Sequence, residues 1–252
     1  MVHWLKYTTS FVLFLLAYMA FTHTNWWCWS ALVYAWLLIP FVELLQQPNT
    51  ANLSETEEIA AKKDRMYDVV LYVAVIIHIV LMFVFLHSLQ TTGLSVAVRI
   101  ARIATMGLLC GTFGINVAHE LGHRINQYKQ AMAKIALLTS LYMHFFLEHN
   151  RGHISGWQRL KTPGTASLQV SVYRFWIRSV IGTYVNAWRI ANKYMQQQGL
   201  PVIHYQNEML QMQVIQLIWV MGIWFFMGWK IALYYIVTAI IVFFIIRNRE
   251  LY

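Results

Sequence analysis

Six strongly apolar segments dominate the sequence and limit the folds that the chain can adopt. A helix that crosses a bilayer needs about 20 mostly apolar residues, and each of these segments approaches that length. Of the 252 residues, 59% are hydrophobic and only 12% are charged. We therefore predict an all-α integral membrane bundle with about six transmembrane helices. The predicted spans are residues 6–21, 26–45, 67–89, 94–117, 209–227 and 231–246.

The largest stretch between predicted spans covers about residues 118–208. We expect it to form a cytoplasmic-side helical insert within a single membrane domain, residues 1–252. Its one apolar helix is predicted at residues 131–147, packed beneath the bundle, with a seventh span as the alternative. Residues 173–198 carry arginine and lysine among apolar residues and are predicted to form an amphipathic helix at the membrane interface.

The net charge of +9 does not indicate a nucleic-acid partner, because the basic residues flank apolar segments and form no separate basic module. The positive-inside rule places most of them, together with the insert, on the cytoplasmic side. Arg99 and Arg102 fit this pattern poorly, since both lie early in the fourth predicted span. We expect them to snorkel to the outer surface or to line a cavity.

Two pairs of histidines are the strongest indication of chemistry. His119 and His123 follow the fourth predicted span, and His149 and His153 follow the predicted apolar helix of the insert. On a helix, a spacing of four residues stacks both imidazoles on one face. We therefore predict that the four histidines bind a common metal ion at the cytoplasmic end of the bundle.

Three further residues near the histidine pairs are candidates for a supporting role. His144 lies one turn before the second pair and is expected to orient or pack against the ligands. Glu120 and Glu148 each adjoin a histidine. They are interpreted as groups that orient imidazole nitrogens or bind metal, with surface carboxylates as the alternative.

The first pair alone also matches the H-E-x-x-H signature of zinc proteases, in which the glutamate acts as general base. An intramembrane zinc metalloprotease that uses Glu120 is therefore one alternative. The second pair argues against it, because a protease site needs one more ligand and an open position. Imidazole-rich sites also suit iron, and a helical bundle with several histidines and carboxylates is typical of a di-iron centre that activates oxygen.

The sequence resembles the membrane-bound alkane 1-monooxygenases, non-haem di-iron enzymes of the fatty acid desaturase and hydroxylase superfamily. The matching segments run in the family's order across nearly the whole chain and are residues 39–45, 64–67, 116–124, 148–153, 174–182 and 207–211. The resemblance implies six transmembrane helices in the bacterial inner membrane and a cytoplasmic-side cluster of histidines that binds two irons. It implies hydroxylation of the terminal carbon of medium-chain n-alkanes, which enter from the membrane lipids. O2 is the oxidant, and rubredoxin and rubredoxin reductase supply the electrons.

Carried over residue by residue, His119 and His123 match the family's first histidine box, and His149 and His153 match the second. The family's second box ends in two adjacent histidines, whereas position 154 is Ile. Two later family segments, Asn-Tyr-x-Glu-His-Tyr and His-x-x-His-His, have no counterpart in the sequence. We expect a truncated or diverged member whose four ligands hold one iron rather than two. A non-catalytic membrane remnant is the remaining alternative.

Basic residues flank both histidine pairs, at Arg124, Arg151, Arg159 and Lys161. Such a face would attract an acidic electron donor such as rubredoxin by charge steering. Positive-inside topology alone is the favoured explanation of the same residues.

Overall fold

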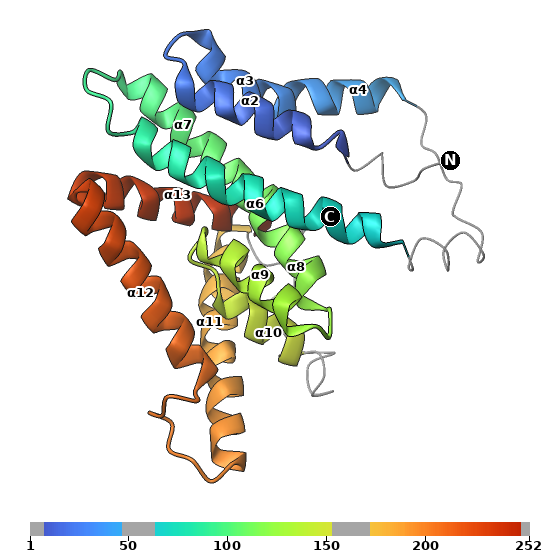
Figure 1. Cartoon of the computed structure of the whole chain (residues 1–252), viewed down its shortest axis with the longest axis vertical. Helices are drawn as coiled ribbons and strands as arrows, with labels where there is room; N and C mark the ends of the chain where they lie inside the picture. The colour runs from blue at the N-terminus through green and yellow to red at the C-terminus, as the bar shows by residue number, and fades with distance from the viewer. Residues whose placement is uncertain (1–7, 47–63, 153–171, 248–252) are drawn as a thin grey trace. The chain divides into compact units, whose positions relative to one another are not determined.

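A computed structural model describes residues 8–46, 64–152 and 172–247, and the regular secondary structure within these ranges is entirely helical (Figure 1). The predicted all-α fold is confirmed. The chain divides into two compact units, Met1–Leu109 and Cys110–Tyr252. The single membrane domain over residues 1–252 remains a prediction.

Most of the predicted spans reappear as long apolar helices. Among the described residues, four helices are long and apolar enough to cross a membrane, and they match the second to fifth predicted spans: Trp26–Leu45, Arg65–Ser88, Val96–Gly122 and Glu208–Met227. The first and sixth predicted spans correspond to two shorter apolar helices, Phe11–Thr22 and Trp229–Val242.

The first unit is built on α2 (Phe11–Thr22), which packs against α6 (Arg65–Ser88) and α7 (Val96–Leu109). The rings of Phe21 and Phe85 join α2 to α6 with their centroids 5.5 Å apart. Residues 26–45, which follow α2, form one helical run that changes pitch along its length. It comprises a 3₁₀ turn (Trp26–Trp29), α3 (Ser30–Val33), a π-helical turn (Tyr34–Leu38) and α4 (Ile39–Leu45).

Arg102 lies on α7 and is only 2% exposed. Its guanidinium donates hydrogen bonds to the carbonyl oxygens of Ser88 at 2.7 Å, His23 at 3.2 Å and Ala20 at 3.4 Å. The carbonyls of Ser88 and Ala20 belong to the last turns of α6 and α2, where backbone acceptors have no partner within their own helix, and His23 directly follows α2. The expectation that Arg102 snorkels to the surface or lines a cavity is therefore wrong. The buried charge is tolerated because backbone dipoles replace water around it.

The second unit begins with a π-helical turn (Cys110–Ile115) and contains both described histidine segments. α8 (Asn116–Gly122) completes the long helix that starts at Val96, and α9 (Gln127–Leu138) packs against α8. α10 (His144–Gly152) lies mainly on α11 (Val172–Gln197), the predicted amphipathic helix. α12 (Glu208–Met227) and α13 (Trp229–Arg247) form a helix hairpin that turns at Gly228, whose φ of 93° favours glycine (Figure 1).

The prediction of one apolar helix over residues 131–147 is wrong, because α9 and α10 divide this stretch between them. The hydroxyls of Thr139 and Ser140 donate to carbonyls in the last turn of α9, at 2.6 and 3.0 Å. Leu141 then takes a left-handed conformation with φ of 53°, and the chain leaves the helix. The sequence does not reveal this break, because the usual residue at such a cap is glycine and here it is leucine.

Candidate metal centre

His119 and His123 project side by side from the C-terminal end of α8. Their spacing of one helical turn brings the ring centroids to 4.7 Å and the two Nε2 atoms to 3.3 Å. Both side chains are exposed. The two imidazoles of the first pair therefore share one face of the helix, as their spacing predicts.

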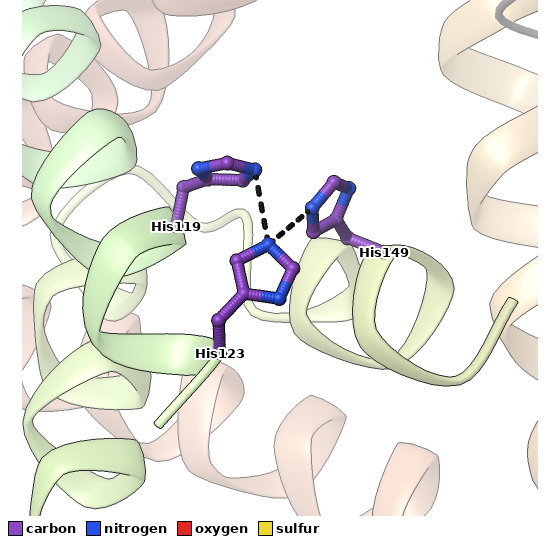
Figure 2. Close-up of side chains that lie close together, drawn as sticks. All are labelled: His119, His123 and His149. Atoms are coloured by element: carbon purple, nitrogen blue, oxygen red, sulfur yellow. Dashed lines mark hydrogen bonds between the residues drawn. The ribbon is translucent and has the colours of Figure 1, made fainter. Parts of the chain in front are cut away.

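α10 brings a third imidazole to the same place. The Nε2 atom of His149 lies 3.0 Å from Nε2 of His123, and its ring centroid lies 4.3 Å from that of His119. One ligand nitrogen from each of the three histidines lies within 4.8 Å of the other two. Figure 2 shows the three rings converging from the two helices.

The distances fit a single metal ion. Two imidazole nitrogens that bind one ion at about 2.1 Å stand about 3.0 to 3.4 Å apart at the angles of octahedral or tetrahedral coordination. Both Nε2 separations, 3.3 and 3.0 Å, agree with this range. An imidazole nitrogen either carries a proton or presents one lone pair, so Nε2 of His123 cannot make a good hydrogen bond with both neighbours. A shared cation would instead accept one lone pair from each of the three imidazoles.

The fourth predicted ligand, His153, lies outside the described residues. The two predicted carboxylates do not belong to the group of three histidines. Glu120 instead accepts a hydrogen bond from the guanidinium of Arg124 at 2.7 Å, one turn further along. Glu148 accepts one from the side-chain amide of Asn186, which ties α10 to α11 at 3.5 Å.

His144 is buried and lies outside the group of three. Its ring makes edge-on contacts with the rings of Tyr142 and Tyr184, at centroid distances of 4.6 and 5.2 Å. The Tyr142 ring stacks on Phe145 at 5.3 Å, and Phe145 in turn stacks on His149. His144 therefore reaches the histidine group through two intervening rings.

Phe145 is a site residue that the sequence argument missed. Its ring lies parallel to that of His149, with an interplanar angle of 15° and centroids 5.0 Å apart. Its centroid also lies 6.4 Å from that of His119. The available signal was its position four residues before His149, which puts both rings on one face of α10. The stacked ring restricts the orientation that the His149 imidazole can adopt.

Three curated relatives show what the chain is similar to, although no family model matches it. Alkane 1-monooxygenase 1 of Alcanivorax borkumensis is 29% identical over 199 residues, covering 78% of this chain and 49% of the relative. Alkane 1-monooxygenase of Ectopseudomonas oleovorans is 33% identical over 164 residues, covering 64% and 41%. Alkane 1-monooxygenase 2 of Pseudomonas aeruginosa is 26% identical over 226 residues, covering 88% and 59%. The chain thus spans about half the length of these relatives.

Proposed function

Because the chain is a relative of the alkane 1-monooxygenases, we propose that it hydroxylates the terminal carbon of medium-chain n-alkanes with O2 at an iron site. The observation that carries this proposal is the convergence of His119, His123 and His149 on a point where one cation would bind all three. His153 is proposed as a fourth ligand on the grounds of its spacing from His149.

The residues of this site would hold and orient the metal, and bound iron would supply the activation of O2. His119 and His123 would present adjacent ligands from one helix face at the end of α8, and His149 would supply the third ligand from α10. Phe145 covers the ring of His149 and keeps water from that side of the ligand. Imidazole ligands suit a divalent iron as well as other metals, so the identity of the ion is part of the test.

The substrate and the electron donor belong to the same proposal. Alkanes dissolve in the hydrocarbon core of a bilayer, which the apolar helices of this chain would reach. We propose that the site faces the cytoplasm of a bacterial inner membrane and receives electrons from rubredoxin and rubredoxin reductase. Of the basic residues that would attract such a donor, Arg124 and Arg151 are 39% and 40% exposed and each is already paired with a glutamate. Their steering of an acidic partner is correspondingly weaker.

The test measures metal content and product formation in membranes that contain the chain. We expect the wild type to carry iron and to convert octane to 1-octanol when rubredoxin, its reductase and NADH are supplied. His119→Ala, His123→Ala and His149→Ala should each lower the iron content at least about 10-fold and abolish octanol formation. His87→Ala is the matched control, because His87 is an exposed histidine that contacts Gln90 at the end of α6.

Two results would overturn the proposal. One is a wild-type chain that carries no iron and forms no octanol. The other is a chain that carries zinc and cleaves peptides, with Glu120→Gln abolishing cleavage, as the protease alternative requires.

A further inference from the structure

The two helices that carry His119 and His149, α8 and α10, come into close contact at Gly122. A Cβ atom at this position would lie 3.1 Å from Nδ2 of Asn150 and 3.5 Å from Cε2 of Phe146. The first distance is shorter than an ordinary van der Waals contact, so a side chain at this position would push the Asn150 amide away by a few tenths of an ångström. Gly122 adjoins His123 in the chain, and Asn150 adjoins His149.

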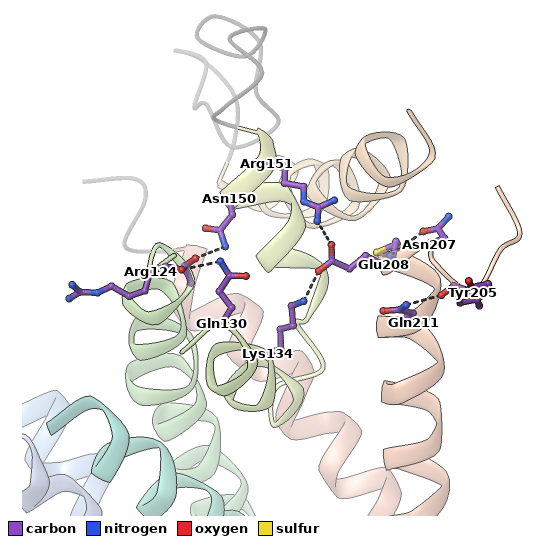
Figure 3. Close-up of polar contacts among 11 residues, drawn as sticks. Arg124, Gln130, Lys134, Asn150, Arg151, Tyr205, Asn207, Glu208 and Gln211 are labelled. Carbon is purple, nitrogen blue, oxygen red and sulfur yellow. Dashed lines mark hydrogen bonds and ion pairs between the residues drawn. The ribbon is translucent and has the colours of Figure 1, made fainter. Parts of the chain in front are cut away.

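A hydrogen bond closes this contact. The side-chain amide of Asn150 donates to the carbonyl oxygen of Gly122 at 3.2 Å. That carbonyl belongs to the last turn of α8, where the helix itself offers no donor. The bond therefore satisfies a helix end and joins α8 to α10 one residue away from a ligand on each side (Figure 3).

The chain just after His123 is held from α9 in a similar way. The side-chain amide of Gln130 donates to the carbonyl oxygen of Arg124 at 2.9 Å. The end of α8 is thus fixed by one amide from α10 and another from α9, which Figure 3 shows side by side.

Another face of α10 is fixed by charge. Arg151 forms an ion pair with one carboxylate oxygen of Glu208 at 2.5 Å, and Lys134 pairs with the other oxygen at 2.5 Å. Glu208 begins α12 and its side chain is only 17% exposed. This carboxylate therefore links α9, α10 and α12.

Three consecutive residues of α10 thus have three different partners. Successive side chains of a helix point about 100° apart, so His149, Asn150 and Arg151 diverge around the axis. His149 meets the imidazoles of α8, Asn150 meets the backbone of α8, and Arg151 meets the carboxylate of α12. The last two contacts constrain both the position and the rotation of the turn that carries the ligand.

We propose that Asn150 and Gly122 are positioning residues of the metal centre, with Arg151 and Glu208 as their counterpart on another face of α10. The close contact at Gly122 sets the separation of His123 and His149, and the ion pair holds α10 in the rotation that directs His149 at the metal. This role rests on the proposed metal-binding function.

The test uses Co²⁺ as a probe of the full chain in detergent micelles, with affinity and the visible absorption of the bound ion as readouts. Asn150→Ala should lower the affinity about 10-fold, the order of effect seen when groups that orient ligands are removed. It should also change the cobalt spectrum, which reports ligand geometry. Gln211→Ala is the matched control. It removes the same type of bond, from a side-chain amide to the carbonyl of Tyr205 at 2.7 Å, which involves neither α8 nor α10.

A second variant tests the separation of the helices directly. Gly122→Ala should also lower the Co²⁺ affinity, because its Cβ displaces Asn150. In the double variant Gly122→Ala/Asn150→Ala the clashing amide is gone, so the affinity should fall no further than in Asn150→Ala alone. This non-additivity is the signature of a direct contact.

The outcomes separate the two proposals. Unchanged affinity and spectrum in both single variants, or equal losses in Gln211→Ala, would overturn the positioning role and leave the metal site intact. A wild-type chain that binds no Co²⁺ would overturn the proposed metal-binding function, and the positioning role with it.

Discussion

The buried guanidinium of Arg102 shows how a single residue can stabilise the ends of two helices. It satisfies carbonyls from α2 and α6 and from the turn after α2, in a unit with few other buried polar groups among its described residues. A lysine could not replace it fully, because the planar guanidinium presents several donors in fixed directions.

Replacing Arg102 with Met should destabilise the first unit by about 3 kcal/mol, since several buried carbonyls lose their donors. The measurement is the free energy of unfolding of the detergent-solubilised chain. Arg99→Met is the matched control, because Arg99 is only partly buried on the same helix. Equal effects of the two substitutions would show that the carbonyl contacts contribute little.

At the scale of elements, the break between α9 and α10 decides where the second histidine segment lies. A continuous helix through this stretch would carry His149 along the axis of α9. The left-handed Leu141 ends α9 and lets α10 begin separately, next to α8. The cost of this conformation for a residue with a Cβ is about 1 to 2 kcal/mol, and the packing around it must offset that cost.

Leu141→Ile tests the importance of this conformation. It keeps the volume and the apolar character, but a β-branched residue is strongly disfavoured at a positive φ. We expect a loss of about 1 kcal/mol in unfolding free energy and weaker Co²⁺ binding. Leu138→Ile, a partly buried position inside α9, should cost only a few tenths of that amount, about 0.3 kcal/mol. A loss at Leu138 as large as at Leu141 would contradict this explanation.

At the scale of the whole molecule, the apolar helices and the positive-inside pattern lead to a prediction of sidedness. The native cysteines Cys28 and Cys110 are free and buried, so a polar maleimide should label them poorly. Ile125, just beyond α8, is 97% exposed, and Lys230 is exposed at the start of α13, directly after the turn that joins α12 to α13. Ile125→Cys should be labelled in inside-out vesicles, and Lys230→Cys in right-side-out vesicles. The reverse pattern would place the histidines on the periplasmic side.

A structural feature can be predicted from the sequence when the signal for it lies within a short stretch of the chain. The apolar spans were predictable because hydropathy accumulates over about 20 residues. The shared face of His119 and His123 was predictable because it depends on one turn of a single helix. Two contacts were not predictable, because each joins segments that are distant in the chain. They are the contact of Asn150 with Gly122 and that of Arg102 with the ends of two helices. The helix break at Leu141 was not predicted, because no glycine or proline marks it.

The divided contacts of α10 also limit how this segment can change in evolution or in design. Replacing His149, Asn150 or Arg151 with a similar residue alters one of the three contacts of α10 and leaves the other two. Inserting or deleting a residue between His149 and Arg151 would turn everything beyond it by about 100° relative to the imidazole, so that either the ligand or its anchors would face the wrong neighbour. Such a segment tolerates substitutions but not insertions or deletions.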